Sequence, residues 1–494
     1  MKTLVKNFIG GKWVEARSRR YFESRNPATG ELVGRCVDSG REEIDQAVKA
    51  AARAFESWRR VPAPRRGEIL FRVAERLVRH KDALARTLTQ EMGKVLTEAK
   101  GDVQEAIDMA AYMAGEGRRL FGHVVPSELP NKSAQCIREP VGVVGLITPW
   151  NFPVAIPAWK SFPALILGNT VVLKPSPETP VTAASFIKII EECGMPPGVV
   201  NLVLGSSAQL GEALVSHPEV ALISFTGSTA TGGKVAVAAA THHKRVALEM
   251  GGKNAILVME DADLDLAVDG IIWSAFGTTG QRCTACSRLI VHTDVKNQLM
   301  KKLLARLAKL RIGNGLKPGI EMGPIINRAQ LEKVHGYVGV GQQEGARLVA
   351  GGKILSEGEF KKGWFYAPTL FDCVTPAMRI AKEEIFGPVL GVLEVKDLDQ
   401  AIAINNEVMQ GLSTSVYTRD LNRAQRAIAD IRTGIVYVNA GTIGSEVHLP
   451  FGGMRRTGNG HREAGQAALE TFSEWKAVYI DYSGRLQRAQ IDTD

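Results

Sequence analysis

Alternating apolar and helical segments in residues 141–250 constrain the fold more than any other feature of this chain. Short runs rich in β-branched residues are separated there by longer segments with helical periodicity. Strands that alternate with helices of about 10–15 residues form βαβ units, and such units place their strands in one parallel sheet with helices on its faces. The strand candidates are residues 141–147, 171–173, 199–204 and 221–225. The pattern starts again beyond Gly251, which predicts a second α/β domain.

The first 120 residues are expected to begin with strands and turns and to continue as helices. Turn residues such as Asn26 and Pro27 punctuate residues 1–35. From Arg41, apolar side chains recur at steps of four and three residues, which builds one apolar stripe along a helix. These side chains are Ile44, Val48, Ala51, Phe55 and Trp58. A second helix is predicted through residues 69–77 and a third around residues 91–94.

The charge and hydropathy of the chain exclude several classes of protein. Lys and Arg total 61 and Asp and Glu total 52, which is a formal net charge of +9. A basic balance is typical of nucleic-acid binding, but no basic run is long and no nucleic-acid motif is present. We therefore expect no nucleic-acid partner and interpret the charge as a solvated surface that favours anionic cofactors. The most apolar region, residues 141–173, is interrupted by prolines and Lys160, so no apolar run reaches the ~18 residues of a membrane span.

The six cysteines are scattered along the chain, which is typical of free thiols in a reducing compartment. The first residues lack the apolar core of a secretion signal, and we expect a cytoplasmic enzyme. Cys283 and Cys286 form a C-x-x-C pair, but no second pair and no suitably spaced histidine accompanies it. No metal site is therefore predicted.

Three short motifs supply the side chains of a covalent reaction. Cys283 lies in the sequence GQRCT beside Arg282, and a cationic neighbour favours the thiolate form of cysteine. Glu249 lies in LEMGGKN, where a glycine pair allows a tight turn. Asn151 lies in TPWNFP and is a polar amide among prolines and aromatic residues. Together they are a candidate nucleophile, base and oxyanion donor.

These motifs, in this order, resemble those of the aldehyde dehydrogenase superfamily, and the resemblance runs nearly from end to end of the chain. It implies an NAD(P)-dependent, non-acylating aldehyde dehydrogenase in which Cys283 attacks the aldehyde carbon. The side-chain amide of Asn151 and the backbone N–H of Cys283 are the implied oxyanion donors. Glu249 is the implied base for the water that releases the carboxylic acid. Acylating relatives commonly lack this glutamate, so its presence favours hydrolysis.

The resemblance also assigns residues to the cofactor. The sequence FTGSTATG follows a strand candidate and opens a helix, whose N-terminus favours a pyrophosphate. From the residues alone, such a start is more often a simple N-cap. In the family this turn contacts the cofactor phosphates, a role that we carry to Gly227 and Ser228. By the same resemblance Lys174 binds the adenosine ribose, Glu384 binds the nicotinamide ribose, Phe386 packs near the nicotinamide ring, and Ile147 and Trp150 line the cleft.

The choice of cofactor, NADP or NAD, is left open by one departure from the family pattern. NAD-preferring members often carry a glutamate three positions after the lysine that corresponds to Lys174, and here that position is Pro177. A carboxylate there accepts the ribose 2′-hydroxyl and repels a 2′-phosphate. Its absence makes NADP acceptable, while the adjacent Glu178 keeps NAD acceptable too.

The resemblance divides the chain into three parts. Residues 1–120 and 141–250 are assigned to a dinucleotide-binding domain, residues 251–450 to a catalytic domain, and residues 121–140 and 465–494 to a small β oligomerisation arm. The arm is expected to pair a strand-like segment, residues 133–144, with a partner in residues 475–480. From the residues alone, either segment can be an ordinary edge strand. The expected assembly is a homo-oligomer, a dimer or a homotetramer.

The substrate is the least specified part of the interpretation. Trp159, eight residues after Asn151, is expected to line the aldehyde tunnel, and residues 441–448 to form its mouth. Arg282 can pair with a carboxylate or phosphate at the far end of the substrate through its planar fork, or it can point into the protein. The first option predicts a semialdehyde with an acid group. The alternatives are a non-phosphorylating glyceraldehyde-3-phosphate dehydrogenase and a non-catalytic binding protein on the same fold, including an RNA-associated one.

Overall fold

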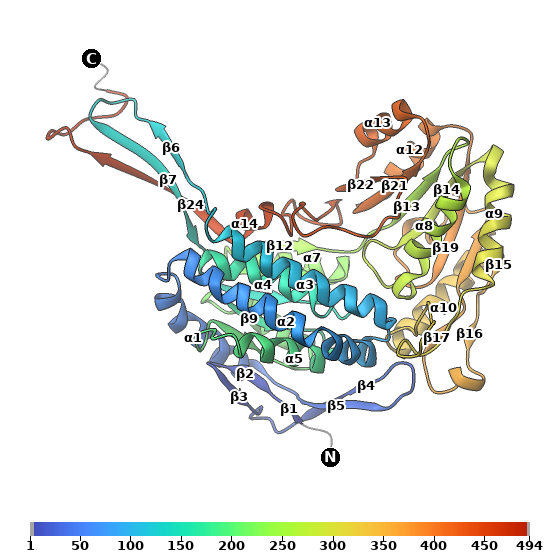
Figure 1. Ribbon diagram of the computed structural model, residues 1–494, viewed down its shortest axis with the longest axis horizontal. Coiled ribbons are helices and arrows are strands. Elements are labelled where there is room, and N and C mark those ends of the chain that lie inside the picture. The colour runs from blue at the N-terminus through green and yellow to red at the C-terminus, as the bar shows by residue number, and fades with distance from the viewer. Residues whose placement is uncertain (1–3, 492–494) are drawn as a thin grey trace.

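A mostly parallel sheet organises the N-terminal body, as the alternating pattern predicts. The computed structural model describes residues 4–491, and Figure 1 shows two bodies of sheet and helix with one projecting arm. The first sheet has the strand order β12-β11-β8-β9-β10-β2-β3. Strands β8 to β12 run parallel to one another, β2 pairs antiparallel with β10, and β3 pairs antiparallel with β2. Its strands are β2 (Asn7–Ile9), β3 (Lys12–Val14), β8 (Val143–Ile147), β9 (Thr170–Lys174), β10 (Val200–Leu202), β11 (Val220–Thr226) and β12 (Arg245–Glu249).

Helices cover both faces of the first sheet because successive side chains of its strands point to opposite sides. On β8, Val144 belongs to one buried core and Val143 to another. The first core includes side chains of α2, α3 and α4, and the second includes side chains of α1 and α6. The helices are α1 (Arg41–Trp58), α2 (Ala63–Met92), α3 (Leu96–Glu116), α4 (Ala155–Leu167), α5 (Pro180–Glu191), α6 (Ala208–Ser216) and α7 (Thr229–Ala240).

Two local predictions are wrong, and a glycine lies at each place. The helix predicted around residues 91–94 does not form, because α2 ends at Met92 and Gly93 adopts a left-handed φ of 90°. A Cβ atom on Gly93 would lie 2.7 Å from Pro324. The strand expected over residues 133–144 is broken at Gly142, whose φ is 126°. Strand β7 therefore ends before this glycine and β8 begins after it.

The second body is built on a separate sheet of the same class, as the renewed alternation beyond Gly251 predicts. Its order is β15-β18-β19-β14-β13-β21-β22, and only the edge strand β15 is antiparallel. The strands are β13 (Asn254–Val258), β14 (Cys286–His292), β15 (Arg347–Ala350), β18 (Thr369–Asp372), β19 (Val389–Val395), β21 (Ser413–Tyr417) and β22 (Ile435–Val438). The helices are α8 (Leu264–Phe276), α9 (Thr293–Leu307), α10 (Arg328–Gln343), α11 (Arg379–Lys382), α12 (Leu398–Glu407) and α13 (Leu421–Asp430). The two sheets support the predicted division of the chain, whose boundaries stay a prediction.

A three-stranded sheet forms the arm that projects from the first body (Figure 1). It consists of β6 (His123–Pro126), β7 (Lys132–Pro140) and β24 (Ser473–Asp481), all antiparallel. The predicted partner in residues 475–480 does pair with β7, with Trp475 opposite Arg138. The Arg138 guanidinium stacks on the Trp475 ring at 4.2 Å. Cross-strand contacts of this kind stabilise the projecting sheet.

The remaining elements are short. They are β1 (Leu4–Val5), β4 (Tyr21–Arg25), β5 (Leu32–Val37), β16 (Ile354–Leu355), β17 (Phe365–Tyr366), β20 (Gln410–Gly411), β23 (Met454–Arg455), α14 (Ala467–Thr471) and the 3₁₀ turns η1 (Gly277–Gly280) and η2 (Gly358–Phe360). Within residues 4–491, no helix combines the length and the apolar character needed to cross a bilayer.

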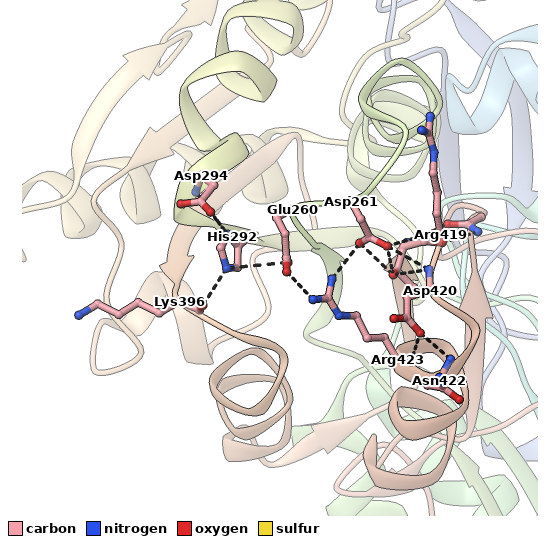
Figure 2. A network of polar contacts seen from close by, with 11 residues as sticks. Glu260, Asp261, His292, Asp294, Lys396, Arg419, Asp420, Asn422 and Arg423 are labelled. Atoms are coloured by element: carbon pink, nitrogen blue, oxygen red, sulfur yellow. Dashed lines mark hydrogen bonds and ion pairs between the residues drawn. The ribbon is translucent and has the colours of Figure 1, made fainter.

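A polar network anchors α13 to the carboxyl end of β13 (Figure 2). The Asp261 carboxylate accepts hydrogen bonds from the backbone N–H groups of Arg419 and Asp420. The Arg423 guanidinium then bridges Asp261 and Glu260. These charged side chains thus join elements of the second body. They lie at a distance from both cavities described below.

Candidate active site

Two cavities meet at the side chain of Cys283. Both are lined by Cys283, Ile156, Thr226 and Met250. The first cavity is lined by the predicted residues Glu249, Trp159 and Arg282, and the second by Asn151, Trp150, Gly227, Ser228, Glu384 and Phe386. Ile147 and Lys174 line neither of these two cavities. The thiol therefore faces two separate spaces, one beside the candidate base and one beside the residues expected to bind the cofactor.

Three consecutive residues with positive φ lead into the Cys283 segment. Thr278, Thr279 and Gly280 have φ values of 50°, 59° and 68°. This left-handed conformation is costly for residues other than glycine, so the two threonines must be held by their surroundings. At Gly280 no side chain fits, because a Cβ atom would lie 2.2 Å from the carbonyl oxygen of Gly387. The turn that presents Cys283 is thus strained and closely packed.

The buried carboxylate of Glu98 holds this turn in place. The backbone N–H of Thr278 donates to Glu98 at 2.8 Å. The Arg282 guanidinium donates to Glu98 at 3.0 Å and to the Thr278 hydroxyl at 2.8 Å. Glu98 belongs to α3, far from the turn in sequence, and nothing in the sequence analysis singled it out. Its role here is to position the segment that carries Cys283.

We expect Glu98→Gln to lower kcat/KM about 10- to 100-fold, because small displacements of a reacting group have effects of this size. The variant should also unfold at a lower temperature, since breaking a buried ion pair by removing one partner costs about 3–5 kcal/mol. Steady-state kinetics and thermal unfolding measure the two effects. Glu75→Gln, on the exposed face of α2, is the matched control. Normal activity and stability in Glu98→Gln would contradict the positioning role.

The expectation that Arg282 favours the thiolate form of Cys283 is wrong, because the Arg282 guanidinium is bound to Glu98 and Thr278. Burial raises the pKa of the Cys283 thiol to about 12, and the nearby carboxylates of Glu249 and Glu384 add to the effect. The thiol is therefore protonated near neutral pH. Since only the thiolate is a nucleophile, the site needs a base that takes the proton.

Glu249, which lines the first cavity together with Cys283, is the predicted candidate for that base. It is the last residue of β12, it is buried, and neither of its carboxylate oxygens has a hydrogen-bond partner among residues 4–491. Burial raises the pKa of Glu249 well above its usual range, and the charge of Glu463 raises it further. Gly452 makes room for the carboxylate, since a Cβ atom there would lie 2.5 Å from it. An unpaired carboxyl group with a raised pKa suits general base catalysis.

A buried ion pair lies behind Glu249 and was not predicted. Lys160 of α4 is fully buried, contacts Glu463 and donates to the Ser224 hydroxyl at 2.9 Å. The Lys160 charge lowers the pKa of Glu249, in opposition to Glu463. The sequence analysis treated Lys160 only as an interruption of an apolar region. The one feature of the sequence that could have indicated this ion pair is a lysine inside an otherwise apolar helix.

Asn151 is held by one of its two amide N–H groups. Its side-chain nitrogen donates to the carbonyl of Gln281 at 3.1 Å, and the residue is buried. A primary amide has two N–H donors, so a second donor is left for an oxyanion formed on a substrate bound to Cys283. The hydrogen bond to Gln281 links Asn151 to the segment that carries the thiol. This geometry supports the predicted oxyanion role, which stays a prediction.

The second cavity has the groups that a dinucleotide requires. Gly227 and Ser228 open α7, and the Ser228 hydroxyl accepts from the N–H of Thr231, so this turn is an N-cap and also lines the cavity. The rings of Trp150 and Phe386 meet edge to face at 5.5 Å. A helix N-terminus favours phosphate, and aromatic rings offer flat apolar surface.

Glu384 reaches the same cavity across a glycine that admits no side chain. Its carboxylate accepts from the N–H of Gly252 at 3.2 Å, and burial raises its pKa to about 7. A Cβ atom on Gly251 would lie 1.9 Å from this carboxylate. The glycine pair noted beside Glu249 is therefore needed for the approach of Glu384 as well as for the turn.

Ile147 and Lys174 lie at the carboxyl ends of adjacent strands β8 and β9. Ligands of open α/β sheets bind at this edge, which is compatible with their predicted roles. The Lys174 amine donates to the carbonyl of Pro175 at 3.3 Å, and burial lowers its pKa to about 8. Glu178, beside Pro177, accepts a hydrogen bond from Asn327 at 2.9 Å. These contacts do not discriminate between NAD and NADP.

Two further residues of the second cavity were missed, Gln330 and Lys333 of α10. The Gln330 amide donates to the carbonyls of Ile385 and Phe386 and so holds the segment that carries Glu384 and Phe386. Burial lowers the pKa of Lys333, and the charge of Glu384 opposes this shift. Neither residue lies in a recognisable motif, so only their spatial position identifies them.

The first cavity is largely apolar around Trp159. Its ring packs edge to face on Phe451 at 5.2 Å, and Gly444 and Ser445 of the predicted mouth loop also line the cavity. Arg282 lines it too, but its guanidinium pairs with Glu98 and stacks on Phe152 and Trp273. Most of the Arg282 guanidinium is therefore engaged by other groups of the protein. This favours the option that Arg282 points into the protein.

Two α/β sheets, and two cavities that meet at a thiol, are the arrangement expected of an enzyme that binds a cofactor beside a covalent nucleophile. The model of the aldehyde dehydrogenase family matches residues 13–478, and the chain belongs to this family. It is 42% identical over 475 residues to the alpha-ketoglutaric semialdehyde dehydrogenase of Bacillus subtilis, covering 96% of this chain and 97% of that protein. It is also 42% identical to the alpha-ketoglutarate semialdehyde dehydrogenase of Haloferax volcanii, covering 97% and 99% of the two chains.

Solved structures agree in fold over almost the whole chain. A crystal structure of betaine aldehyde dehydrogenase from Staphylococcus aureus in complex with NAD+ matches with a TM-score of 0.95 and 35% identity, covering 98% of this chain and 96% of that one. An NAD-dependent aldehyde dehydrogenase from Sinorhizobium meliloti matches with a TM-score of 0.96 and 37% identity, covering 99% and 97%. The predictions of family, fold class and aldehyde oxidation to the acid are confirmed. The two alternatives, a glyceraldehyde-3-phosphate dehydrogenase and a binding protein, are not favoured.

Proposed function

We propose that this enzyme oxidises a semialdehyde that carries a carboxylate to the corresponding dicarboxylic acid. Cys283 is the nucleophile, Glu249 the base and Asn151 an oxyanion donor. The assignment of these residues depends on one observation. The cavity proposed for the substrate and the cavity proposed for the cofactor meet at Cys283. The substrate class is supported by the relatives, of which several are named for semialdehydes of dicarboxylic acids.

The residues of the second cavity fit a nicotinamide dinucleotide. The turn at Gly227 and Ser228 would hold the phosphates, Glu384 a ribose, and Phe386 and Trp150 the ring. The hydroxyl of Thr226, also on this wall, is buried and has no hydrogen-bond partner among the described residues, so a ligand can satisfy it. When bound, the cofactor supplies the hydride acceptor. The structural relative from Staphylococcus aureus was crystallised with NAD+, which supports NAD as one acceptable cofactor beside NADP.

The protein's own groups account for the bond changes at the substrate carbon. Glu249 takes the proton of the Cys283 thiol, and the sulfur forms a bond to the aldehyde carbon. The oxygen of that carbon gains negative charge, which the free N–H of Asn151 and the backbone N–H of Cys283 stabilise. After oxidation the carbon is held as a thioester. Glu249 loses the thiol proton to solvent and can then deprotonate a water. The hydroxide adds to the thioester carbon, the carbon–sulfur bond breaks to release the acid, and the leaving thiolate of Cys283 regains a proton from Glu249.

The test is turnover of a panel of aldehydes by the purified protein with NAD+ and with NADP+, followed by the absorbance of the reduced nicotinamide. The panel contains the semialdehydes of 2-oxoglutarate, succinate and malonate, together with betaine aldehyde and pentanal. We expect the largest kcat/KM among the three semialdehydes. A larger value for betaine aldehyde or pentanal would overturn the proposed substrate class, and no turnover of any aldehyde would overturn the assigned chemistry.

We also propose that the arm binds a second copy of this chain. Its sheet projects from the first body (Figure 1), and large apolar side chains of β6 and β24 are exposed: Val124, Val125, Trp475, Tyr479 and Ile480. By strand register, Val125, Trp475 and Tyr479 lie on one face of the sheet and Val124 and Ile480 on the other. Exposed apolar side chains of this size mark an interaction site. Light scattering on a Val124→Glu, Tyr479→Glu double variant should show monomers, and an unchanged mass would contradict the proposal.

The proposed cytoplasmic location has one supporting observation. All six cysteines are free, including the exposed Cys373. Free thiols are typical of reducing compartments.

A further inference from the structure

The substrate cavity contains a carboxyl group that the proposed chemistry does not use. Glu105 of α3 lines the first cavity together with Cys283, Glu249 and Trp159. Among residues 4–491, no hydrogen bond or ion pair engages its side chain. An unpaired carboxyl group among apolar side chains is unfavourable, and Phe152, Ile156 and Phe451 line the same cavity.

The cations nearest to Glu105 are already paired with other acids. Lys94 donates to Asp102 at 3.1 Å in a fully buried pair, and Asp102 lies one turn before Glu105 on the same helix. Arg282 pairs with Glu98, two turns before Glu105. Neither cation is therefore available to neutralise Glu105 completely. The side chain remains free to contact whatever enters the cavity.

We propose that Glu105 is a specificity-determining residue whose protonated carboxyl group donates a hydrogen bond to the acidic far end of the substrate. This inference rests on the proposed function of the site, since it concerns the substrate that Cys283 attacks. A carboxylic acid hydrogen-bonded to a carboxylate forms a short, charge-assisted contact. Such a contact distinguishes a semialdehyde from a plain aldehyde of the same length, because the plain aldehyde leaves the donor unpaired.

The surroundings keep the Glu105 carboxyl group in the form that donates. Burial raises the pKa of Glu105 to about 8, and the charges of Asp102 and Asp108 on its own helix add to the shift. Arg282 and Lys94 oppose it. From β22, Tyr437 faces the same region, and the charge of Glu105 contributes to raising the pKa of its phenol. Glu105 is therefore mainly protonated near neutral pH and becomes a repelling anion in mildly alkaline solution.

The test compares glutaric semialdehyde with pentanal, which has the same chain length and no acid group. Both substrates use the same thiol and base, so the ratio of their kcat/KM values cancels the titration of Cys283 and Glu249. In the native enzyme this ratio should fall about tenfold between about pH 7 and 9, as one group with a pKa of about 8 loses its proton. The change should appear in KM for the semialdehyde.

Two variants separate the proton from the side chain. Glu105→Gln keeps an N–H donor of similar size, so the ratio should stay within about threefold of the native value near pH 7 and become independent of pH. Glu105→Leu removes the donor, and the ratio should fall about 10- to 100-fold at every pH. The circular dichroism of both variants should match that of the native protein, which excludes misfolding.

Two outcomes would overturn the inference: a native ratio that does not change with pH, and a Glu105→Leu ratio equal to the native one. Calorimetric binding of glutarate provides a readout without turnover. If the native protein oxidises no aldehyde, the proposed function fails. Even in that case, glutarate binding by the native protein that is lost in Glu105→Leu would support the assignment of Glu105. Equal glutarate binding by the native protein and by Glu105→Leu would refute it.

Discussion

Replacing Cys283 with alanine should abolish aldehyde oxidation, with kcat lower by roughly 10⁵- to 10⁶-fold, the effect typical of losing a covalent nucleophile. Of the four side chains that line both cavities, Cys283 is the one with a thiol, so the other three cannot replace it as the nucleophile. Steady-state turnover of the best aldehyde measures the loss. Cofactor binding, followed by fluorescence quenching, should change little because the second cavity keeps its other walls.

Cys286→Ala is the matched control for this experiment. Cys286 lies three positions later, is buried at the start of β14, and lines neither of the two cavities. Burial raises the pKa of its thiol to about 12, as for Cys283, so the two variants differ in position rather than in acidity. We expect the control to retain activity within about threefold, with a modest loss of stability from a small cavity. Equal activity of the two variants would refute covalent catalysis by Cys283.

Replacing Glu249 with glutamine should lower kcat by about 100- to 10 000-fold, the usual contribution of a general base. The loss should be large because Cys283 is held as a thiol and water must also be deprotonated, and Glu249 is the unpaired carboxyl group beside both. Glu249→Asp, which keeps the charge on a shorter side chain, should recover part of the activity. A Glu249→Gln enzyme with unchanged kcat would mean that another group takes the proton.

The pH dependence of kcat tests the same assignment with a defined sign. A general base acts only when deprotonated, so activity should decline as pH falls through the raised pKa of Glu249. Glu463→Gln removes the charge that raises this pKa and leaves Lys160, which lowers it. The acid limb should therefore move to lower pH in Glu463→Gln. A shift toward higher pH would show that Lys160 and Glu463 do not act on Glu249 as the structure implies.

The sequence-based predictions were most successful where local pattern and chemistry agree. The strand candidates at 141–147, 171–173, 199–204 and 221–225 correspond to β8, β9, β10 and β11, with ends that differ by at most three residues. Two predictions failed at Gly93 and Gly142, where a left-handed backbone ends an element. A pattern of apolar residues cannot show that one particular glycine adopts a left-handed conformation, because glycine occurs in many conformations.

The candidate site was predicted less completely, and the reason differs between residues. Cys283, Glu249 and Asn151 could be predicted because each lies in a motif of recognisable composition, and the structure brings all three to the two cavities. Glu98 and Glu105 were missed because one face of α3 looks in sequence like the solvated face of an ordinary helix. The direction of the pKa shift of the Cys283 thiol was predicted wrongly, because adjacency to Arg282 in sequence does not mean that the guanidinium faces the sulfur.

The sequence by itself determined the α/β class, the alternation that builds two sheets, the family, and the three groups expected to react. These properties are encoded locally, in periodicity and in short motifs, and need no knowledge of distant contacts. Only the tertiary structure decided which cation pairs with which acid, which ionisable groups are buried, and which carboxyl groups line the first cavity. Those outcomes depend on contacts such as Glu98 with Arg282 and Lys160 with Glu463, which join residues 184 and 303 positions apart. Burial and charge act through space, so ionisation follows the folded arrangement and not the order of the chain.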